Sequence, residues 1–156
     1  MKQHEIQQIE NAIRVATEAH AGQVYAKTEP YILHPLRVMA RFNDRPYYPE
    51  KAKHMMIAVL HDVIEDTPVT AGELLYAGIP AGVVDAVVEM SRYPDEPYLE
   101  YVARVAKHPD ARVVKLADLK ENLSYSTGEK GDSPRASLVP RYERAVAMVQ
   151  AAMASA

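Results

Sequence analysis

The chain has 156 residues, 48% hydrophobic and 25% charged, which predicts one globular domain over residues 1–156. Lysine and arginine number 18 against 21 aspartates and glutamates, so the formal net charge is −3 and no broad nucleic-acid surface is expected. The sequence holds no cysteine, which excludes disulfides and thiolate-bound zinc or iron–sulfur clusters. It also contains no apolar leader and no run of about 18 apolar residues, so we expect a soluble cytoplasmic protein that does not bind membranes.

Apolar residues recur at helical spacing through most of the chain. Gly22 ends the first apolar stripe, and Pro35 is expected to open the second helix, with His34 outside it because proline disfavours helical backbone in the preceding residue. Residues 83–88 fit a buried strand or a helix, and we favour a helix because no second strand is predicted to pair with them. The fold class is therefore all-α, a single bundle of about seven or eight helices. The expected helices span about 4–20, 35–42, 50–66, 70–76, 80–88, 98–107, 109–124 and 140–153, with a capping box at Thr70 and Glu73.

The segment HDVIED, residues 61–66, lies at the end of the apolar helix expected over 50–66. At 100° per residue, its imidazole and three carboxylates cluster on one side, where they destabilise the helix unless a positive charge lies among them. Acidic groups at a helix C-terminus also face the negative end of the helix dipole. The residues alone fit either a metal site or a solvated acidic turn.

Two residues elsewhere are candidates to join that segment. His34 precedes a proline, so its imidazole is free to turn inward. Asp118 follows the apolar run of residues 113–117, which predicts a buried helix, and its charge then needs a metal or a cation such as Lys115 or Arg112. Together the candidates supply two imidazoles and two carboxylates, which suit Mn²⁺, Fe²⁺, Co²⁺ or Zn²⁺, and we favour Mn²⁺. The predicted ligands are His34, His61, Asp62 and Asp118.

Such an ion lowers the pKa of a bound water and polarises phosphorus. Glu65, one turn after His61, is expected to deprotonate or orient that water, and Asp66 to share the task or hold an outer hydrogen bond. The sequence has no phosphate-binding P-loop, no Rossmann glycine motif and no protease or hydrolase serine motif. We therefore expect phosphate hydrolysis at a metal.

Three motifs occur in order, YILHP at 31–35, HDVIED at 61–66 and KLADLKEN at 115–122. This set resembles the HD-domain phosphohydrolases, and among them the RelA/SpoT-type (p)ppGpp hydrolase domain and the small alarmone hydrolases, over about residues 16–125. The resemblance implies an HD-type helical bundle, Mn²⁺ on the four predicted ligands, and Glu65 and Asp66 as the pair that activates water. The implied substrate is a nucleotide, ppGpp, which loses its 3′-pyrophosphate to give GDP and pyrophosphate.

The resemblance also implies substrate contacts by Asn122 and Tyr142. The family commonly carries Arg-Lys in the loop before PYI, where the arginine packs on guanine, whereas this chain has Tyr25-Ala26-Lys27. We expect Tyr25 and Lys27 to contact the substrate there. Leu119 stands where the family usually has arginine, and fewer cations predict weaker binding of ppGpp. Two alternatives stay open, a phosphohydrolase for another nucleotide or phosphorylated metabolite and a non-catalytic nucleotide-binding module; no oligomeric state follows from the sequence.

Overall fold

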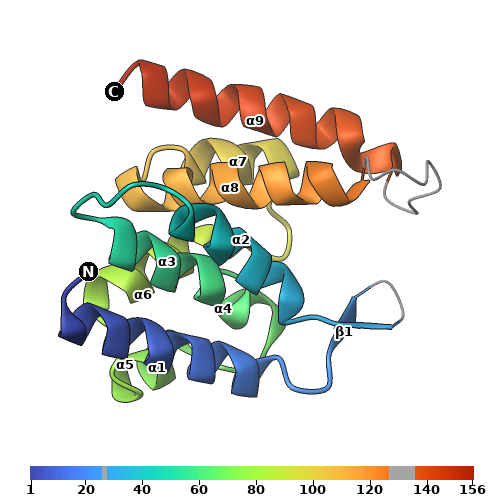
Figure 1. The fold of residues 1–156 in the computed structure, drawn as a ribbon. Helices are drawn as coiled ribbons and strands as arrows, with labels where there is room; N and C mark the ends of the chain where they lie inside the picture. The colour runs from blue at the N-terminus through green and yellow to red at the C-terminus, as the bar shows by residue number, and fades with distance from the viewer. Residues whose placement is uncertain (26–27, 127–135) are drawn as a thin grey trace. The chain divides into compact units, whose positions relative to one another are not determined.

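The computed structural model describes residues 1–25, 28–126 and 136–156. The chain divides into two compact units, 1–91 and 92–156. Helices make up most of both units (Figure 1), which confirms the all-α fold class. The described residues contain nine α-helices, more than the seven or eight expected, because one expected helix is in fact two. The assignment of residues 1–156 to a single domain stays a prediction.

The first unit is built around α3 (Lys51–Leu60). Every residue of α3 except Lys53 is buried, as expected for a helix that is apolar on nearly all sides. Helices α1, α2 and α6 contact it. The other elements of this unit are α1 (Gln3–Ala19), β1 (Val24–Tyr25), β2 (Glu29–Pro30), α2 (Leu33–Asn43), α4 (Val63–Asp66), α5 (Ala71–Tyr76) and α6 (Ala81–Met90). The helix expected over 80–88, which also fitted a strand, is α6.

A buried lysine joins the end of α2 to the start of α3. The Lys51 Nζ donates to the carbonyl oxygens of Asn43 at 2.8 Å and Arg45 at 2.5 Å. Carbonyls at a helix C-terminus lack intrahelical donors, and the helix dipole favours a cation there. Lys51 is only 7% exposed, so these carbonyls replace the water that its ammonium loses on folding.

Helix α2 begins at Leu33 and not at Pro35, so the expectation that His34 lies outside the helix is wrong. The first turn of a helix tolerates proline because its N–H groups have no intrahelical acceptor. The His34 N–H instead donates to the Tyr31 carbonyl at 3.0 Å. His34 therefore has a helical backbone and is held in the first turn of α2.

The single helix expected over 50–66 is also wrong, because α3 ends at Leu60 and α4 begins at Val63. Between them, His61 Nδ1 bonds to the Ala58 carbonyl at 2.7 Å, so the ring occupies an acceptor in the last turn of α3. Side-chain bonds of this kind compete with the backbone ladder at helix ends. The acidic residues therefore follow a break in the helix and do not end a continuous one.

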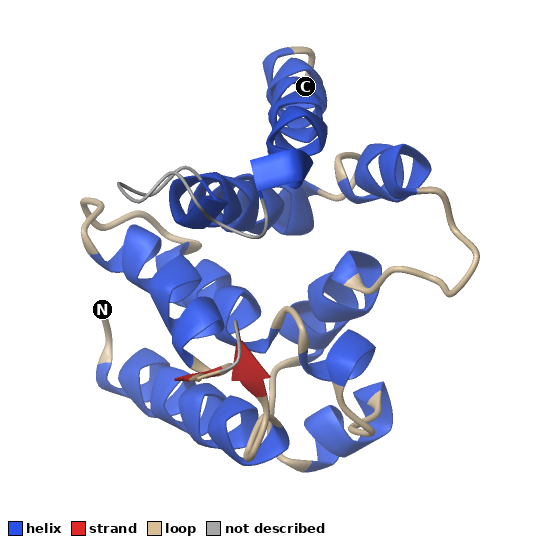
Figure 2. Cartoon of the chain, turned by 90° about the vertical axis from the view of Figure 1, so that its right-hand side faces the viewer, coloured by secondary structure: helices blue, strands red, loops and turns tan. Residues whose placement is uncertain are grey.

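The segment between α1 and α2, expected to be loop, contains a short antiparallel ladder (Figure 2). Val24 pairs with Pro30, and Tyr25 pairs with Glu29. Gly22, which was expected to end the first helix, has a φ of +81°, a left-handed conformation that suits glycine after a helix C-terminus. This turn directs the chain from α1 into the ladder.

Helix α5 begins with the capping box that the sequence predicts. The Thr70 Oγ1 accepts from the Glu73 N–H at 3.2 Å, and the Thr70 N–H donates to Glu73 Oε2 at 2.8 Å. We expect Thr70→Ala to lower the free energy of unfolding by about 1 kcal/mol in urea denaturation. Thr17→Ala is the control, because the exposed Thr17 hydroxyl bonds only within α1, to the Ile13 carbonyl, and its loss should change stability by less than about 0.5 kcal/mol. Equal losses in both variants would contradict the capping role.

The second unit contains α7 (Tyr98–Val105), α8 (Pro109–Ser126), the short 3₁₀ helix η1 (Ala136–Leu138) and α9 (Val139–Ala154). Helix α8 contacts both α7 and α9. It buries Ala111, Val114, Ala117 and Leu119, in keeping with the apolar pattern of its sequence. The sequence analysis expected this helix to be buried around Asp118, and α8 is buried there on one face, whereas Val113 and Leu116 keep some exposed surface.

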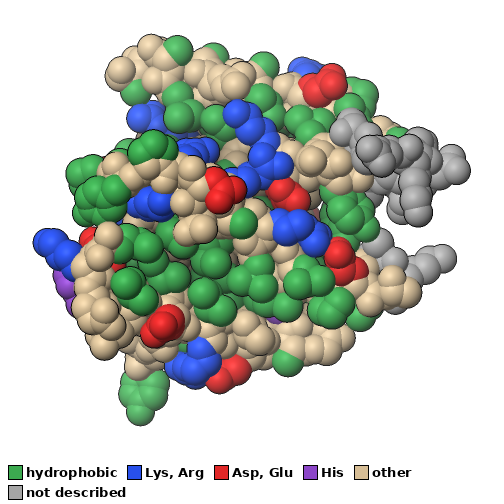
Figure 3. All heavy atoms as spheres, in the orientation of Figure 1, with side chains coloured by type: hydrophobic (Ala, Val, Ile, Leu, Met, Phe, Trp, Pro, Cys, Tyr) green, Lys and Arg blue, Asp and Glu red, His purple; other side chains and the backbone are tan. Residues whose placement is uncertain are grey.

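Several large hydrophobic side chains lie at the surface of the first unit, and Figure 3 shows hydrophobic and charged side chains side by side on one face. Val24 is 60% exposed, Tyr47 57% and Tyr76 96%. They come from β1, the turn before α3 and α5, and exposed hydrophobic residues of this kind are common in folded proteins. Within the described ranges, none of the helices combines the length and apolar content needed to span a bilayer.

Candidate metal centre

Two buried imidazoles and one carboxylate meet in the first unit. His34 comes from the first turn of α2, His61 follows α3, and Asp62 is the N-cap of α4. His34 is 5% exposed, His61 is 2% exposed, and Asp62 is half-buried. One potential ligand atom from each lies within 4.8 Å of the other two. The structure therefore brings together three of the four residues predicted as ligands.

The distances within this group suit one cation. The Asp62 Oδ2 lies 3.0 Å from His61 Nε2 and 4.0 Å from His34 Nε2. Because the Ala58 carbonyl only accepts, His61 Nδ1 carries the hydrogen and the neutral ring presents a lone pair at Nε2. A lone pair that faces a carboxylate is compensated by a proton or a metal ion, and two ligands about 2.1 Å from one ion are typically about 3 Å apart. The donor set fits a divalent transition metal.

Two further carboxylates extend this group. Asp62, Glu65 and Asp66 also place one potential ligand atom each within 4.8 Å of one another. Although Asp66 keeps exposed surface, loss of water around its carboxylate raises its pKa, and the Asp62 carboxylate raises that pKa further, while a hydrogen bond from Tyr31 lowers it. Carboxylates at this spacing repel one another, and either a proton on one of them or a cation bound beside them relieves the repulsion.

Tyr31, which the sequence analysis did not assign to the site, joins the two parts of this group. Its hydroxyl donates to Asp62 Oδ2 at 2.5 Å and lies 3.3 Å from Asp66 Oδ2. Tyrosine has no strong preference for such sites, so the one sequence signal was its position three residues before His34 in the YILHP motif.

Gln23, also unassigned from the sequence, ties the start of the ladder to α4. Its Nε2 donates to the Asp66 carbonyl at 2.8 Å, and its own main-chain carbonyl accepts from the Tyr31 N–H at 2.9 Å. Because Nε2 faces a carbonyl, Oε1 faces His20 and accepts from its Nδ1 at 2.8 Å. His20 is 2% exposed, and its contact with the half-buried Gln23 is part-buried.

Tyr25 and Lys27 were expected to contact the substrate in the loop where the family carries Arg-Lys, and the structure describes only Tyr25 of the two. Tyr25 is 5% exposed, and its ring stacks on His34 with centroids 5.9 Å apart and an interplanar angle of 3°. One ring face is therefore already occupied by a predicted metal ligand. Lys27 lies outside the described residues. Substrate contacts by both residues stay predictions.

Asp118 belongs to the second unit, where a lysine compensates its charge. The Lys115 Nζ lies 2.8 Å from Asp118 Oδ2, and the Asn122 Nδ2 donates to Asp118 Oδ1 at 3.0 Å. Asp118 is 3% exposed and Lys115 is 7% exposed. Burial lowers the pKa of Lys115, but the Asp118 carboxylate and nearby tyrosine hydroxyls outweigh it and raise that pKa well above its ordinary value. The sequence allowed either a metal or a lysine to compensate the charge of Asp118, and the structure contains the lysine, Lys115. The role of Asp118 as fourth metal ligand stays a prediction.

The other substrate-binding predictions also fall in the second unit. Asn122 is half-buried beside Asp118 on α8, and Tyr142 on α9 is 6% exposed. Leu119, at the position where the family usually has arginine, is fully buried. A buried leucine packs where a charged side chain would need a partner. Substrate contacts by Asn122 and Tyr142 stay predictions.

Several curated proteins with similar sequences carry a (p)ppGpp hydrolase activity in their names, and others are named as GTP pyrophosphokinases. The chain is 32% identical over 133 residues to the bifunctional (p)ppGpp synthase/hydrolase SpoT of Escherichia coli K12, which covers 79% of this chain and 18% of that protein. It is 37% identical over 119 residues to the guanosine-3′,5′-bis(diphosphate) 3′-pyrophosphohydrolase of Haemophilus influenzae, covering 70% of this chain and 17% of that protein. The chain thus spans less than a fifth of the length of these relatives. It matches no protein-family model.

A solved structure supports the same relationship at the level of the fold. The structure, described as a metazoan ortholog of SpoT that hydrolyzes ppGpp, superposes with a TM-score of 0.73 at 22% identity and covers 93% of this chain and 84% of that one. The chain is an HD-type, ppGpp hydrolase-like protein. In this HD-type chain, the motif histidine His34 and the His61-Asp62 pair are the residues that the fold brings together in the first unit.

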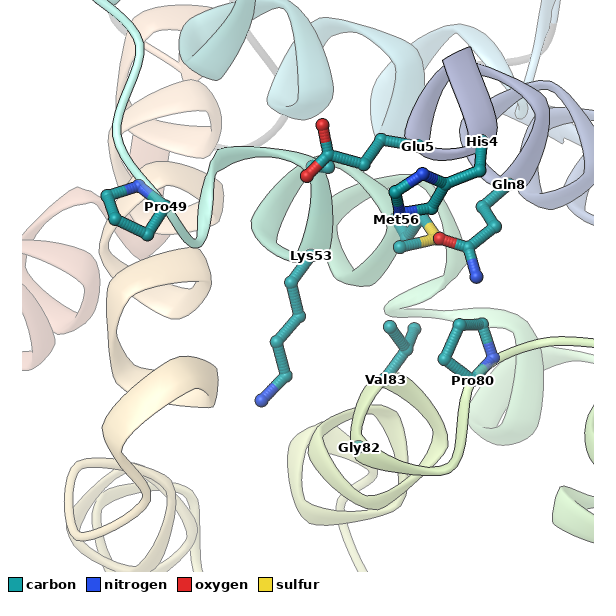
Figure 4. Close-up of a pocket in the computed structure, with 10 residues that line it drawn as sticks. His4, Glu5, Gln8, Pro49, Lys53, Met56, Pro80, Gly82 and Val83 are labelled. Atoms are coloured by element: carbon teal, nitrogen blue, oxygen red, sulfur yellow. The ribbon is translucent and has the colours of Figure 1, made fainter. Parts of the chain in front are cut away.

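The HD-type chain also has a hollow of about 250 Å³ in its first unit, drawn in Figure 4. None of its lining residues belongs to the imidazole and carboxylate group. In Figure 4 the Lys53 side chain extends from α3 toward the start of α6 near Gly82. The remaining lining residues are His4, Glu5, Gln8, Pro49, Ala52, Met56, Pro80 and Val83. The hollow is therefore lined by other residues than His34, His61 and Asp62.

Proposed function

We propose that this protein is a metal-dependent phosphohydrolase that removes the 3′-pyrophosphate from ppGpp in the cytoplasm. The observation that carries the proposal is the cluster of His34, His61 and Asp62 next to Glu65 and Asp66. Relatives named as guanosine-3′,5′-bis(diphosphate) 3′-pyrophosphohydrolases support the substrate. Water would attack the phosphorus bonded to the 3′ oxygen, that P–O bond would break, and the products would be GDP and pyrophosphate.

The proposed ion is Mn²⁺, held by His34, His61 and Asp62 with Asp118 as the fourth ligand. Two imidazoles with carboxylates suit Mn²⁺, Fe²⁺, Co²⁺ or Zn²⁺, and the 3.0 Å separation of His61 Nε2 and Asp62 Oδ2 supports a shared ion. When bound, a divalent cation polarises the phosphate and makes the attacking water more acidic. The chain's own contribution is to fix the His61 tautomer through the Ala58 carbonyl, so that Nε2 faces the ion.

Glu65 is the proposed general base, and Asp66 orients the same water. Glu65 is exposed, so its carboxylate is accessible to water and substrate, and a potential ligand atom of it lies within 4.8 Å of those of Asp62 and Asp66. A positioned base of this kind typically contributes a factor of about 10²–10⁴ to the rate. Glu65 would take a proton from the attacking water while the water oxygen bonds to phosphorus. The departing 3′ oxygen would gain a proton from solvent.

Asn122 and Tyr142 are the proposed contacts to the ribose and phosphates of the substrate, and Lys27 is proposed to offset the negative charge of the phosphates.

Tyr25 favours a second candidate function, hydrolysis of a different phosphorylated nucleotide. In place of the arginine that packs on guanine in the family, this chain has a tyrosine that is 5% exposed and already stacked on His34. A buried ring has less surface to offer a base than a flexible guanidinium.

A panel of nucleotides separates these functions. Purified protein is loaded with Mn²⁺ and offered ppGpp, nucleoside monophosphates and 3′-phosphorylated adenosine derivatives, and pyrophosphate and orthophosphate are measured separately. We expect GDP and pyrophosphate from ppGpp. Orthophosphate from the other substrates would favour the second candidate, and bound metal without turnover would favour a binding module. Asp62→Asn protein, purified in the same way, controls for contaminating phosphatases.

A further inference from the structure

Tyr31 contacts both halves of the proposed site and is assigned no role in it so far. Its hydroxyl donates to Asp62 Oδ2 at 2.5 Å, the same oxygen that lies 3.0 Å from His61 Nε2. The hydroxyl also lies 3.3 Å from Asp66 Oδ2. One phenol group therefore connects a proposed ligand to a carboxylate proposed to orient water.

The Tyr31 ring is itself held in place by neighbours in the first unit. Its centroid lies 4.9 Å from the His20 ring, which is buried, and 6.1 Å from the His34 ring. Its N–H donates to the Gln23 carbonyl at 2.9 Å. A side chain fixed by both its backbone and its ring presents its hydroxyl at a defined position, which a freely rotating side chain does not do.

Gln23 makes a second connection between α4 and the segment 20–31. The Gln23 Nε2 donates to the Asp66 main-chain carbonyl at 2.8 Å, while the Gln23 Oε1 accepts from His20. Backbone and side chain of Asp66 are thus both contacted from the segment 20–31. The Asp62 carboxylate is half-buried, and the hydrogen bond from Tyr31 is one of the contacts that restrict its rotation.

We propose that Tyr31 is a positioning residue. Its hydroxyl fixes the Asp62 carboxylate beside His34 and His61, and it also keeps the Asp66 carboxylate close to that of Asp62. This role of Tyr31 rests on the proposed function, in which Asp62 binds the ion and Asp66 orients water. Outer hydrogen-bond partners of metal ligands typically change metal affinity or activity by about 10- to 100-fold when removed. Tyr31 is expected to fall in that range.

Tyr31→Phe tests this inference, because it removes the hydroxyl and keeps the ring that packs on His20. Mn²⁺ affinity is measured by titration, and the visible absorption of the Co²⁺-loaded protein reports the geometry of the ligands. We expect the dissociation constant for Mn²⁺ to rise by about 10- to 100-fold and the Co²⁺ spectrum to change. At saturating Mn²⁺, kcat for ppGpp should fall while KM stays within about twofold, because Tyr31 acts on the reacting groups and not on substrate binding.

Tyr48→Phe is the matched control. The Tyr48 hydroxyl also bonds to a buried side chain of the first unit, His54 Nδ1 at 3.0 Å, and no hydrogen bond joins it to those proposed site residues that the structure describes. The Tyr48→Phe variant should lose a comparable hydrogen bond, while its Mn²⁺ affinity and Co²⁺ spectrum stay unchanged. The urea midpoint of both variants without metal shows whether either change acts through stability.

The outcomes separate the inference from the proposed function. Unchanged Mn²⁺ affinity and Co²⁺ spectrum in Tyr31→Phe would overturn the positioning role, even if the wild-type protein hydrolyses ppGpp. Equal losses in Tyr31→Phe and Tyr48→Phe would overturn it as well. A wild-type protein whose metal site depends on Tyr31, yet which releases no pyrophosphate from ppGpp, would support the inference and overturn the proposed substrate.

Discussion

Replacing Glu65 with glutamine is expected to lower kcat for pyrophosphate release from ppGpp by about 100- to 10,000-fold while the protein keeps its metal. Glutamine has nearly the same shape but accepts no proton at neutral pH. The side chain is exposed, so stability should change by less than about 0.5 kcal/mol. The measurement pairs steady-state kinetics with metal analysis of the same preparation.

Glu10→Gln provides the control for the loss of one carboxylate. Glu10 is exposed on α1, and no site residue is assigned there, so kcat should be unchanged. If Glu65→Gln protein loses the ion together with its activity, Glu65 is a ligand and the proposed division of roles is wrong. Full activity in Glu65→Gln would remove the general base from the mechanism.

Replacing Asp118 with alanine should destabilise the protein by about 3–5 kcal/mol, because Lys115 then keeps a buried charge without its anion. The pair is 2.8 Å apart, and both residues are almost wholly buried. If Asp118 is also the fourth ligand, the same variant binds Mn²⁺ at least about tenfold more weakly. Urea denaturation and Mn²⁺ titration measure the two effects separately.

A double variant, Lys115→Met with Asp118→Leu, separates the ion pair from the metal. Replacing both charges with apolar side chains of similar volume is typically neutral or stabilising, so most of the lost stability should return. Mn²⁺ affinity should stay low, because methionine and leucine supply no oxygen ligand. Wild-type Mn²⁺ affinity in either variant would show that Asp118 serves only as the partner of Lys115.

Helical periodicity predicted the fold class because most helices of this chain bury one face, and the residues of that face recur about every 3.6 positions along the sequence. The helix over 81–90 was favoured over a strand because no partner strand was predicted, and that reasoning held. Two boundaries were wrong, one because of a side-chain hydrogen bond and one because the first turn of a helix tolerates proline. His61 bonds the Ala58 carbonyl and ends α3 early, and the start of α2 tolerates Pro35 in its first turn.

Residue type led to three residues that the fold brings together, His34, His61 and Asp62. Histidines number only six in this chain, so the two imidazoles were recognisable, whereas their role as metal ligands stays a prediction. Tyr31 and Gln23 were missed because their roles depend on which atoms they face, and periodicity carries no such information. Asp118 illustrates the same limit, because its sequence context fitted both a metal and the lysine that the structure contains.

The two hydrogen bonds that orient His61 and Asp62 differ in how easily mutation can remove them. His61 is oriented by the main-chain carbonyl of Ala58, which persists whatever side chain occupies position 58. Asp62 is oriented by the Tyr31 hydroxyl, which a single nucleotide change can delete by converting tyrosine to phenylalanine. The tautomer of His61 is therefore robust to sequence drift. The geometry of Asp62 is the more easily changed of the two, because it depends on the side chain at position 31.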